Sequence, residues 1–137
     1  MPLYMCNARK GAIDATAKAA IAADITRIHC DITGAPPAFV HVFFFEAAPH
    51  LPLEDRQAVL VGNIRDGRTA AQKAQLAEQM IASIHAHTGI ATDEIAASVS
   101  DTPARWVMEG GDVLPEPGAE AAWLVAHEAK RVAQNAG

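Results

Sequence analysis

The segments Asn7-Ala8-Arg9-Lys10-Gly11 and Asn63-Ile64-Arg65-Asp66-Gly67 share the pattern Asn-x-Arg-x-Gly, and their first residues are 63 − 7 = 56 positions apart. Two further pairs match at this spacing, the second with a one-residue slip: Ile28-His29 with Ile84-His85, and Thr33-Gly34 with Thr88-Gly89. The five-residue pattern alone is compatible with ordinary turn chemistry. All three matches together indicate a structural duplication, which organises the rest of the chain.

Each repeat is predicted to contain one amphipathic helix. In the first repeat, isoleucines four, three and four residues apart form a helical stripe that ends at Gly34: Ile21, Ile25, Ile28 and Ile32. In the second repeat, Thr69 and Gln72 have the spacing of a capping box. A second stripe follows and runs up to Gly89: Leu76, Met80 and Ile84.

Four apolar segments flank these helices and are predicted to be strands: Leu3–Cys6, Phe39–Phe45, Ala58–Gly62 and Ile95–Val99. We therefore expect an α+β fold of two tandem βαβ repeats, about residues 2–46 and 58–100, with both helices on one face of a four-stranded sheet. The tail, residues 101–137, is rich in proline and glycine up to Gly118 and then predicts a helix from Glu120 to Gln134. This tail is expected to wrap the core or a neighbouring subunit.

The run Phe39-Val40-His41-Val42-Phe43-Phe44-Phe45 is apolar nearly throughout, which is typical of a strand buried on both faces. Two helices cover only one face of the sheet. Because another copy of the chain is the simplest cover for the other face, the sequence predicts an obligate oligomer.

Composition limits the function classes. The 137 residues are half hydrophobic and 20% charged, which fits a single domain spanning 1–137, and the net charge of −5 gives no basic footprint for nucleic acid. No apolar run approaches the roughly 20 residues that span a bilayer. The first residues lack the features of a signal peptide, and two lone cysteines, Cys6 and Cys30, make no disulfide framework. A cytoplasmic protein with neither a nucleic-acid nor a membrane partner is expected.

Pro2 is the first candidate for chemistry. If Met1 is removed, the proline nitrogen becomes a secondary amine with a reference pKa near 8, able to act as acid or base at neutral pH. Alternatively, Pro2 only protects the start of an edge strand. If Met1 is retained, the proline nitrogen is an amide and cannot act.

Other polar residues suggest a binding site for an anion. Arg65 and Arg68 are three residues apart where a loop becomes a helix, so their guanidinium groups can converge as a carboxylate clamp, although solvated surface arginines are the alternative. His29 follows Ile25 by four residues and faces partly inward, where it either binds a substrate oxygen or is a satisfied core histidine. Glu109 lies in the glycine-rich stretch 108–111, predicted to be a flexible loop, where a solvated glutamate is the default.

No metal or cofactor is expected. His85 and His87 are two residues apart near a helix end and point to different sides, which makes a poor metal pair. Neither cysteine has a histidine base at a readable spacing, so cysteine nucleophiles are not expected either.

A strand that starts at Pro2, a βαβ duplication and a short chain together resemble the tautomerase superfamily, and within it cis-3-chloroacrylic acid dehalogenase and its relatives. The matching stretches run nearly end to end: Ile25-Thr26-Arg27-Ile28-His29, Thr33-Gly34, Arg65-Asp66-Gly67-Arg68, Pro103-Ala104, Glu109, Gly111 and Leu114-Pro115-Glu116-Pro117-Gly118.

The resemblance implies roles for particular residues. The family's catalytic proline and glutamate fall on Pro2 and Glu109, and its substrate-binding histidine and two arginines fall on His29, Arg65 and Arg68. The family's tyrosine is replaced by Ser98, which is too short to substitute directly for the phenol. A homotrimer is also implied.

The expected substrate is a small unsaturated or 2-oxo carboxylate bound by the arginines. In one reaction, neutral Pro2 moves a proton between an enol oxygen and carbon. In the other, Glu109 activates water for addition at C3 while protonated Pro2 protonates C2. Tautomerase or hydratase activity ranks first, and efficient cis-3-haloacrylate dehalogenation second, because of Ser98. A non-enzymatic binding or signalling relative, as in the cytokine branch, is a third alternative.

Overall fold

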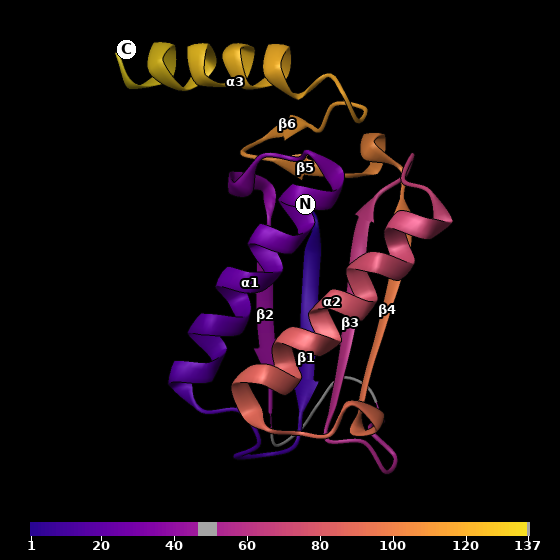
Figure 1. Cartoon of the computed structure of the whole chain (residues 1–137). Coiled ribbons are helices and arrows are strands. Elements are labelled where there is room, and N and C mark those ends of the chain that lie inside the picture. The colour runs from indigo at the N-terminus through magenta and orange to yellow at the C-terminus, as the bar shows by residue number, and fades with distance from the viewer. Residues whose placement is uncertain (47–51, 137) are drawn as a thin grey trace.

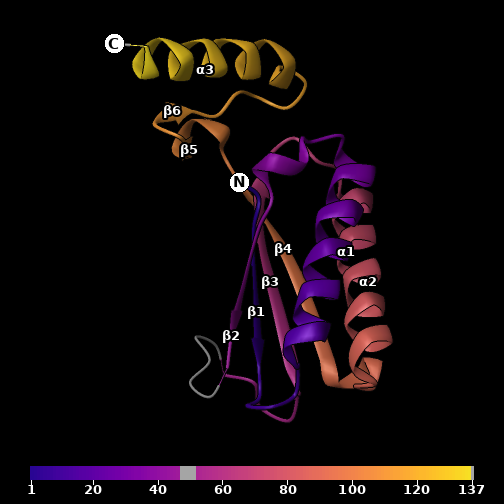
Figure 2. The ribbon, with the colours of Figure 1, turned by 90° about the vertical axis from the view of Figure 1, so that its left-hand side faces the viewer.

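The computed structural model describes residues 1–46 and 52–136. Two βαβ units form its body: β1 (Leu3–Ala8), α1 (Ala15–Thr33) and β2 (His41–Phe45), then β3 (Ala58–Arg65), α2 (Ala70–Thr88) and β4 (Ile95–Thr102). The sheet order is β2-β1-β3-β4, with β1 parallel to β2, β3 parallel to β4, and β1 antiparallel to β3. Both helices lie on one face (Figures 1 and 2). The predicted α+β architecture is confirmed.

Local sequence signals set the helix ends. The Thr69 amide donates to Gln72 Oε1 over 2.9 Å and the Gln72 amide donates to Thr69 Oγ1 over 3.0 Å, which confirms the predicted capping box. Helix α1 begins after Asp14, whose carboxylate accepts from an amide of the first turn. Gly34 and Gly89 end the two helices in the left-handed conformation, with φ of 76° and 74°.

The main core lies between the helix pair and the sheet. The helix stripes and the inward-facing strand residues are almost fully buried: Ile21, Ile25, Ile28, Leu76, Met80, Ile84, Tyr4, Cys6, Leu60 and Ile64. Burial of each such side chain contributes about 1.5–3 kcal/mol. Gly62 has a specific part in this packing, because a Cβ there would lie 2.5 Å from Tyr4 Cε1. The absence of a side chain at Gly62 lets the Tyr4 ring lie against the β3 backbone.

The strand predicted from 39 to 45 differs from expectation. Pro37–Phe39 form a 3₁₀ turn, and β2 starts at His41 as an edge strand. Side chains on its helix side pack on the core, whereas Phe43 on the other side is 51% exposed. A single chain therefore covers only one face of β2, because both helices lie on the same side of the sheet, and burial of the other face by another copy stays a prediction.

The other three strands extend two or three residues beyond the predicted ends. Strand β1 continues to Ala8, β3 to Arg65 and β4 to Thr102, because the backbone pairing continues through polar positions such as Asn63. Arg65 is consequently the last residue of β3 rather than part of the loop before α2.

The tail folds over the end of the sheet where the chain begins. After a 3₁₀ turn at Ala104–Trp106 come β5 (Met108–Glu109), β6 (Asp112–Val113) and α3 (Glu120–Asn135), the last of which projects from the body in Figures 1 and 2. The predicted C-terminal helix is confirmed to within one residue. A second apolar cluster joins the tail to the N-terminus: Met1, Phe39 and Leu114, with Val107, Trp123 and Leu124 against them.

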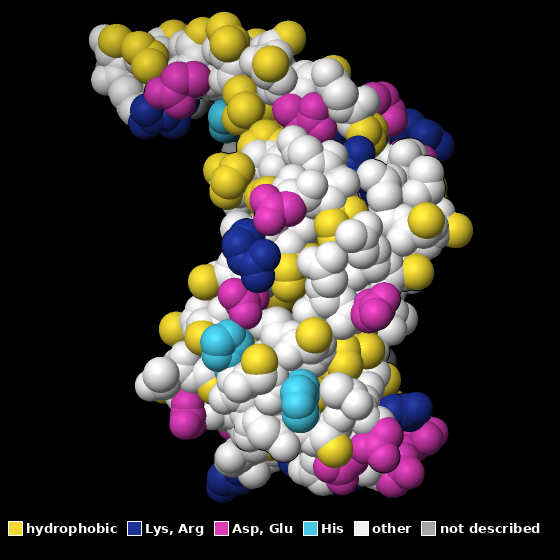
Figure 3. Space-filling view, viewed as in Figure 1, with side chains coloured by type: hydrophobic (Ala, Val, Ile, Leu, Met, Phe, Trp, Pro, Cys, Tyr) yellow, Lys and Arg dark blue, Asp and Glu magenta, His cyan; other side chains and the backbone are white. Residues whose placement is uncertain are grey.

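On the helix side of the molecule, hydrophobic side chains are scattered among polar and charged ones, while several gather along the projecting α3 (Figure 3). In the part of the chain that the structure describes, no helix has both the length and the apolar character needed to cross a membrane.

Candidate active site

The N-terminus meets the end of β3 because β1 and β3 are antiparallel. Pro2 precedes β1 and is less than 2% exposed, and Arg65 closes β3 at the same end of the sheet. The His41 amide donates to the Pro2 carbonyl over 2.9 Å, which fixes the start of the chain against β2. From the tail, the Glu109 carboxylate forms an ion pair with the Met1 ammonium group. Residues from β2, β3 and β5 thus lie around the first two residues.

The amine at this site is partly withdrawn from solvent. Burial lowers the pKa of the Met1 amine below 8.0, the Glu109 carboxylate opposes this shift, and the nearby Arg65 charge adds to it. While Met1 is attached, the Pro2 nitrogen is a peptide nitrogen. The ionisable amine here belongs to Met1.

His29 is fully inside the protein. It is 2% exposed, and its Nδ1 shares a 2.7 Å hydrogen bond with the Tyr4 hydroxyl. Burial lowers the pKa of His29 to about 3, with further contributions from Arg68, Arg65 and the N-terminal amine. The imidazole is therefore neutral at physiological pH. Its hydrogen bond to Tyr4 is typical of a core histidine, yet the charges of the two arginines and of the N-terminal amine still affect its pKa.

Arg65 is not a solvated surface arginine, because its side chain is only 2% exposed. Its Nη1 donates to the Pro115 carbonyl over 2.6 Å, its Nη2 donates to Glu120 Oε1 over 2.7 Å, and its guanidinium carbon lies 5.4 Å from the centre of the Phe39 ring. Burial alone would raise the pKa of Glu120, but the Arg65 contact together with backbone hydrogen bonds from Glu120 and Gly118 lowers it. Arg65 thereby ties the start of α3 to β3.

Arg68 has a different environment. It directly precedes Thr69, the N-cap of α2, and its buried Nε has no hydrogen-bond partner among the described residues. Burial lowers the pKa of Arg68, and repulsion from Arg65 adds to the shift. A buried donor without a partner costs about 1–3 kcal/mol, so the Nε–H group is suited to donate a hydrogen bond to an anion. The helix N-terminus beside it favours negative charge as well.

Glu109 lies in a β-hairpin rather than in a loop, so the expectation of a flexible loop is wrong. It is paired with Asp112 in the β5–β6 ladder. Gly110 at the turn has φ of 57°, and a Cβ there would lie 2.5 Å from His127 Cε1. His127 shares a 2.7 Å hydrogen bond with Asp112 and stacks on Trp123 at 4.6 Å between ring centroids. Helix α3 therefore fixes the turn next to Glu109.

A cavity of about 400 Å³ opens beside Glu109, and its wall includes Met1, His41 and Phe43. His41 Nε2 lies 3.1 Å from Glu109 Oε1 and 3.4 Å from Oε2. Space for a small molecule is therefore adjacent to the N-terminal amine and the carboxylate.

Ser98 is not brought into this cluster. It lies on β4 in register with Val61, whose own β1 partner is Met5, and it is exposed on the face opposite the helices. The structure thus brings five of the six candidates to one end of the sheet and leaves Ser98 on the open face.

Three residues that contact the site were not found from the sequence: Tyr4, His41 and Glu120. His41 is the only polar residue in the apolar run from 39 to 45, and this could have been a signal. Tyr4 and Glu120 gave none, since an inward strand position and a first-turn glutamate are common.

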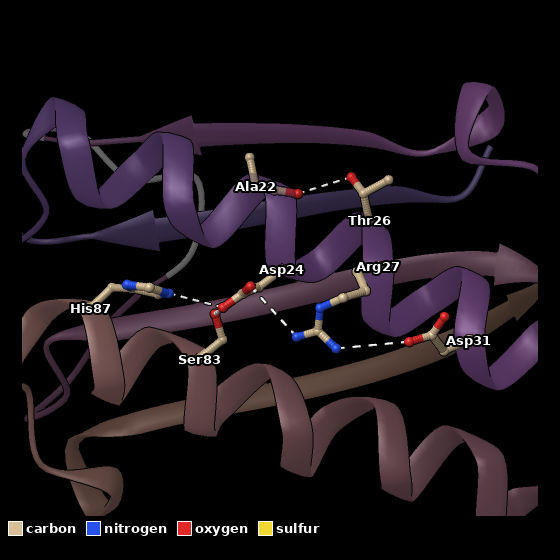
Figure 4. A network of polar contacts seen from close by, with 7 residues as sticks. All are labelled: Ala22, Asp24, Thr26, Arg27, Asp31, Ser83 and His87. Atoms are coloured by element: carbon tan, nitrogen blue, oxygen red, sulfur yellow. Dashed lines mark hydrogen bonds and ion pairs between the residues drawn. The ribbon is translucent and has the colours of Figure 1, made fainter.

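The helix pair carries another polar network, which is not arranged as a serine nucleophile with a histidine base. Asp24 accepts from Ser83 Oγ over 2.8 Å and contacts His87 Nε2 at 2.9 Å, so the carboxylate rather than the histidine is central (Figure 4). His85 instead bonds to the Ile90 carbonyl, which confirms that the two histidines diverge. Among residues 1–46 and 52–136, no group of three or more His, Cys, Asp or Glu side chains is arranged to hold a metal ion.

Comparison with known families identifies the superfamily of the chain. A sequence model of the family described as "Putative oxalocrotonate tautomerase enzyme" matches residues 1–130. The chain belongs to the tautomerase superfamily, which confirms the resemblance seen in the sequence. Among curated proteins, none matches it significantly.

Solved structures place the chain near one branch of this superfamily. It is similar to N1, a member of the cis-3-chloroacrylic acid dehalogenase family, with 32% identity over 90% of this chain and 91% of that chain and a TM-score of 0.80. It is also similar to Ps01740, with 35% identity over 79% of this chain and 100% of that one, and a TM-score of 0.72. The asymmetric trimer of fused 4-OT, at 24% identity over 82% of this chain and 95% of that chain, shares the fold with a TM-score of 0.70.

Proposed function

We propose that the chain, after removal of Met1, is an enzyme in which the Pro2 amine is the acid or base acting on a small unsaturated or 2-oxo carboxylate. The observation that carries this proposal is that a partly buried N-terminal amine, the Glu109 carboxylate and the two arginines share one end of the sheet. Tautomerase or hydratase activity fits these groups best.

Substrate binding is assigned mainly to Arg68. Its buried Nε is free to donate to a carboxylate, whereas Arg65 is already bonded to Glu120 and supplies additional positive potential. Neutral His29 is assigned to a substrate oxygen at the same end. This division of roles makes Arg68 the stronger determinant of affinity.

In the tautomerase reaction, the neutral Pro2 amine takes the proton of the enol hydroxyl. The oxygen becomes a carbonyl, and the carbon at the far end of the former double bond takes a proton from the resulting ammonium group. Burial and the Arg65 charge lower the pKa of the Met1 amine, and once Met1 is removed the same surroundings would favour the neutral Pro2 base that starts this reaction.

In the hydration reaction, Glu109 takes a proton from water while the hydroxyl adds to C3, and the Pro2 ammonium gives a proton to C2. If C3 carries a halogen, the adduct loses the hydrogen halide and leaves an aldehyde acid. Glu109 contacts the Met1 amine and raises its pKa, and beside a free Pro2 amine the same carboxylate would favour the ammonium form that this reaction needs. Dehalogenation is the second candidate, supported by the similarity to N1 and weakened by the position of Ser98.

The active form is proposed to be a homotrimer; fused 4-OT, which shares the fold, is described as a trimer. Hydrophobic side chains on the open face of the sheet, such as Met5, Phe43 and Val61, would be covered by other copies. We expect no cofactor, and we expect a cytoplasmic location.

The test compares the processed protein and its Glu109→Gln variant with two substrates. Ketone formation from the enol of phenylpyruvate should survive the substitution, whereas halide release from cis-3-chloroacrylate should fall by about 100-fold or more because no group then takes the proton of water. Acylation of the amine should abolish both. Turnover that survives acylation would refute proline catalysis, and failure to turn over either compound would favour a non-enzymatic relative.

A further inference from the structure

We propose that His41 is a positioning residue that holds the Glu109 carboxylate against the N-terminal amine, and its consequence for turnover rests on the function proposed above. This histidine lies outside the residues matched to the family and inside a strand whose other members are apolar.

His41 contacts both halves of the pair. Its backbone amide donates to the Pro2 carbonyl over 2.9 Å, which locates the start of the chain. Its side chain reaches Glu109 with Nε2 at 3.1 and 3.4 Å from the two carboxylate oxygens. One residue of β2 therefore fixes the amine through its main chain and the carboxylate through its imidazole.

Glu109 needs such a contact. The hairpin fixes its backbone, but its side chain is 21% exposed at the cavity and could otherwise turn into solvent. Of the two partners of the carboxylate, the Met1 ammonium group is lost when Met1 is removed, so it cannot hold the carboxylate in the processed enzyme. The imidazole is the remaining contact, and it comes from a strand paired directly with β1.

The other charged groups near the amine and Glu109 have partners of their own. Arg65 acts on the amine from β3 and is itself bonded to Glu120, while Asp112, His127 and Lys130 form a separate cluster beyond the turn. The structure shows no contact between His41 and these groups. Its effect on the amine is therefore expected to pass through Glu109.

The experiment measures the amine directly, on the chain that begins with Met1, and needs no turnover. The acylation rate of the amine is followed against pH, with the modified residue identified by mass spectrometry. Because Glu109 raises the pKa of the Met1 amine, Glu109→Gln should lower the midpoint. His41→Ala should lower it in the same direction, His41→Gln should restore most of the shift by retaining a donor, and His41→Ala should add nothing to Glu109→Gln.

His85→Ala is the matched control, since His85 bonds to a backbone carbonyl at the end of α2 and should leave the midpoint unchanged. In the processed enzyme, His41→Ala should lower kcat for halide release about tenfold and leave KM within about twofold. A midpoint that falls with Glu109→Gln but stays constant with His41→Ala would overturn the proposal. That outcome would count against His41 and leave proline catalysis intact. If instead the midpoints shift as expected but the processed protein turns over neither substrate, the result would count against the proposed function alone.

Discussion

Replacement of Arg68 by alanine should weaken turnover without weakening the fold. The buried Nε of Arg68 has no partner in the unliganded chain, so its removal breaks no native hydrogen bond at that atom. In the complex, this group is assigned a charge-assisted bond to the substrate carboxylate, worth about 1.5–3 kcal/mol. Since 1.36 kcal/mol corresponds to a factor of ten, kcat/KM should fall by about 10- to 150-fold.

The control is Arg9→Ala, which changes the arginine of the first repeat's Asn-x-Arg-x-Gly motif, the counterpart of Arg65 rather than of Arg68. Arg9 lies at the opposite end of the sheet, where Nε donates to the Arg56 carbonyl over 3.0 Å. Its loss should alter kcat/KM by less than about twofold. The assay follows ketonisation of the phenylpyruvate enol, with thermal unfolding of each variant measured in parallel. Equal kinetic losses in both variants, or a loss in Arg68→Ala explained by unfolding, would refute the assignment of Arg68.

Three further predictions concern stability and assembly. Between pH 6.5 and 5, the unfolding free energy should fall as the pH is lowered, by up to about 1.4 kcal/mol per pH unit, because His29 takes up a proton in the unfolded but not in the folded chain. The slope should decrease in His29→Gln, and an unchanged slope would contradict this. Gly110→Ala should cost about 1–3 kcal/mol more than Gly111→Ala in denaturant unfolding, because both have positive φ but only Gly110 faces His127. Sedimentation should show a trimer at micromolar concentration that Phe43→Glu dissociates, and a stable wild-type monomer would exclude that assembly.

The duplication, both helices and the caps could be predicted because they depend on local patterns. The isoleucine stripe of α1 and the capping box of Thr69 are short-range signals, and the structure reproduces them. The strand ends were less predictable, since the pairing of β1 with β3 carries both strands through polar residues. The edge position of β2 could not be predicted, because an apolar run does not show whether a strand lies at an edge.

The candidate site depends on contacts between distant parts of the chain. Sequence resemblance singled out Arg65 and Glu109, but it could not show that Glu120, 55 residues away, bonds to Arg65. Nor could it show that α3 holds the hairpin of Glu109 through His127. These contacts form only when the tail folds across the N-terminal end of the sheet.

The most direct test of proline catalysis compares two preparations that differ only at the N-terminus, one beginning at Pro2 and the other retaining Met1, each verified by intact mass. The initial rate of phenylpyruvate enol ketonisation is measured for both at equal concentration and pH. The proposed mechanism predicts turnover by the form beginning at Pro2, and at least a 100-fold lower rate when the proline nitrogen is an amide. Equal rates in the two preparations would show that the Pro2 nitrogen is not the acid or base.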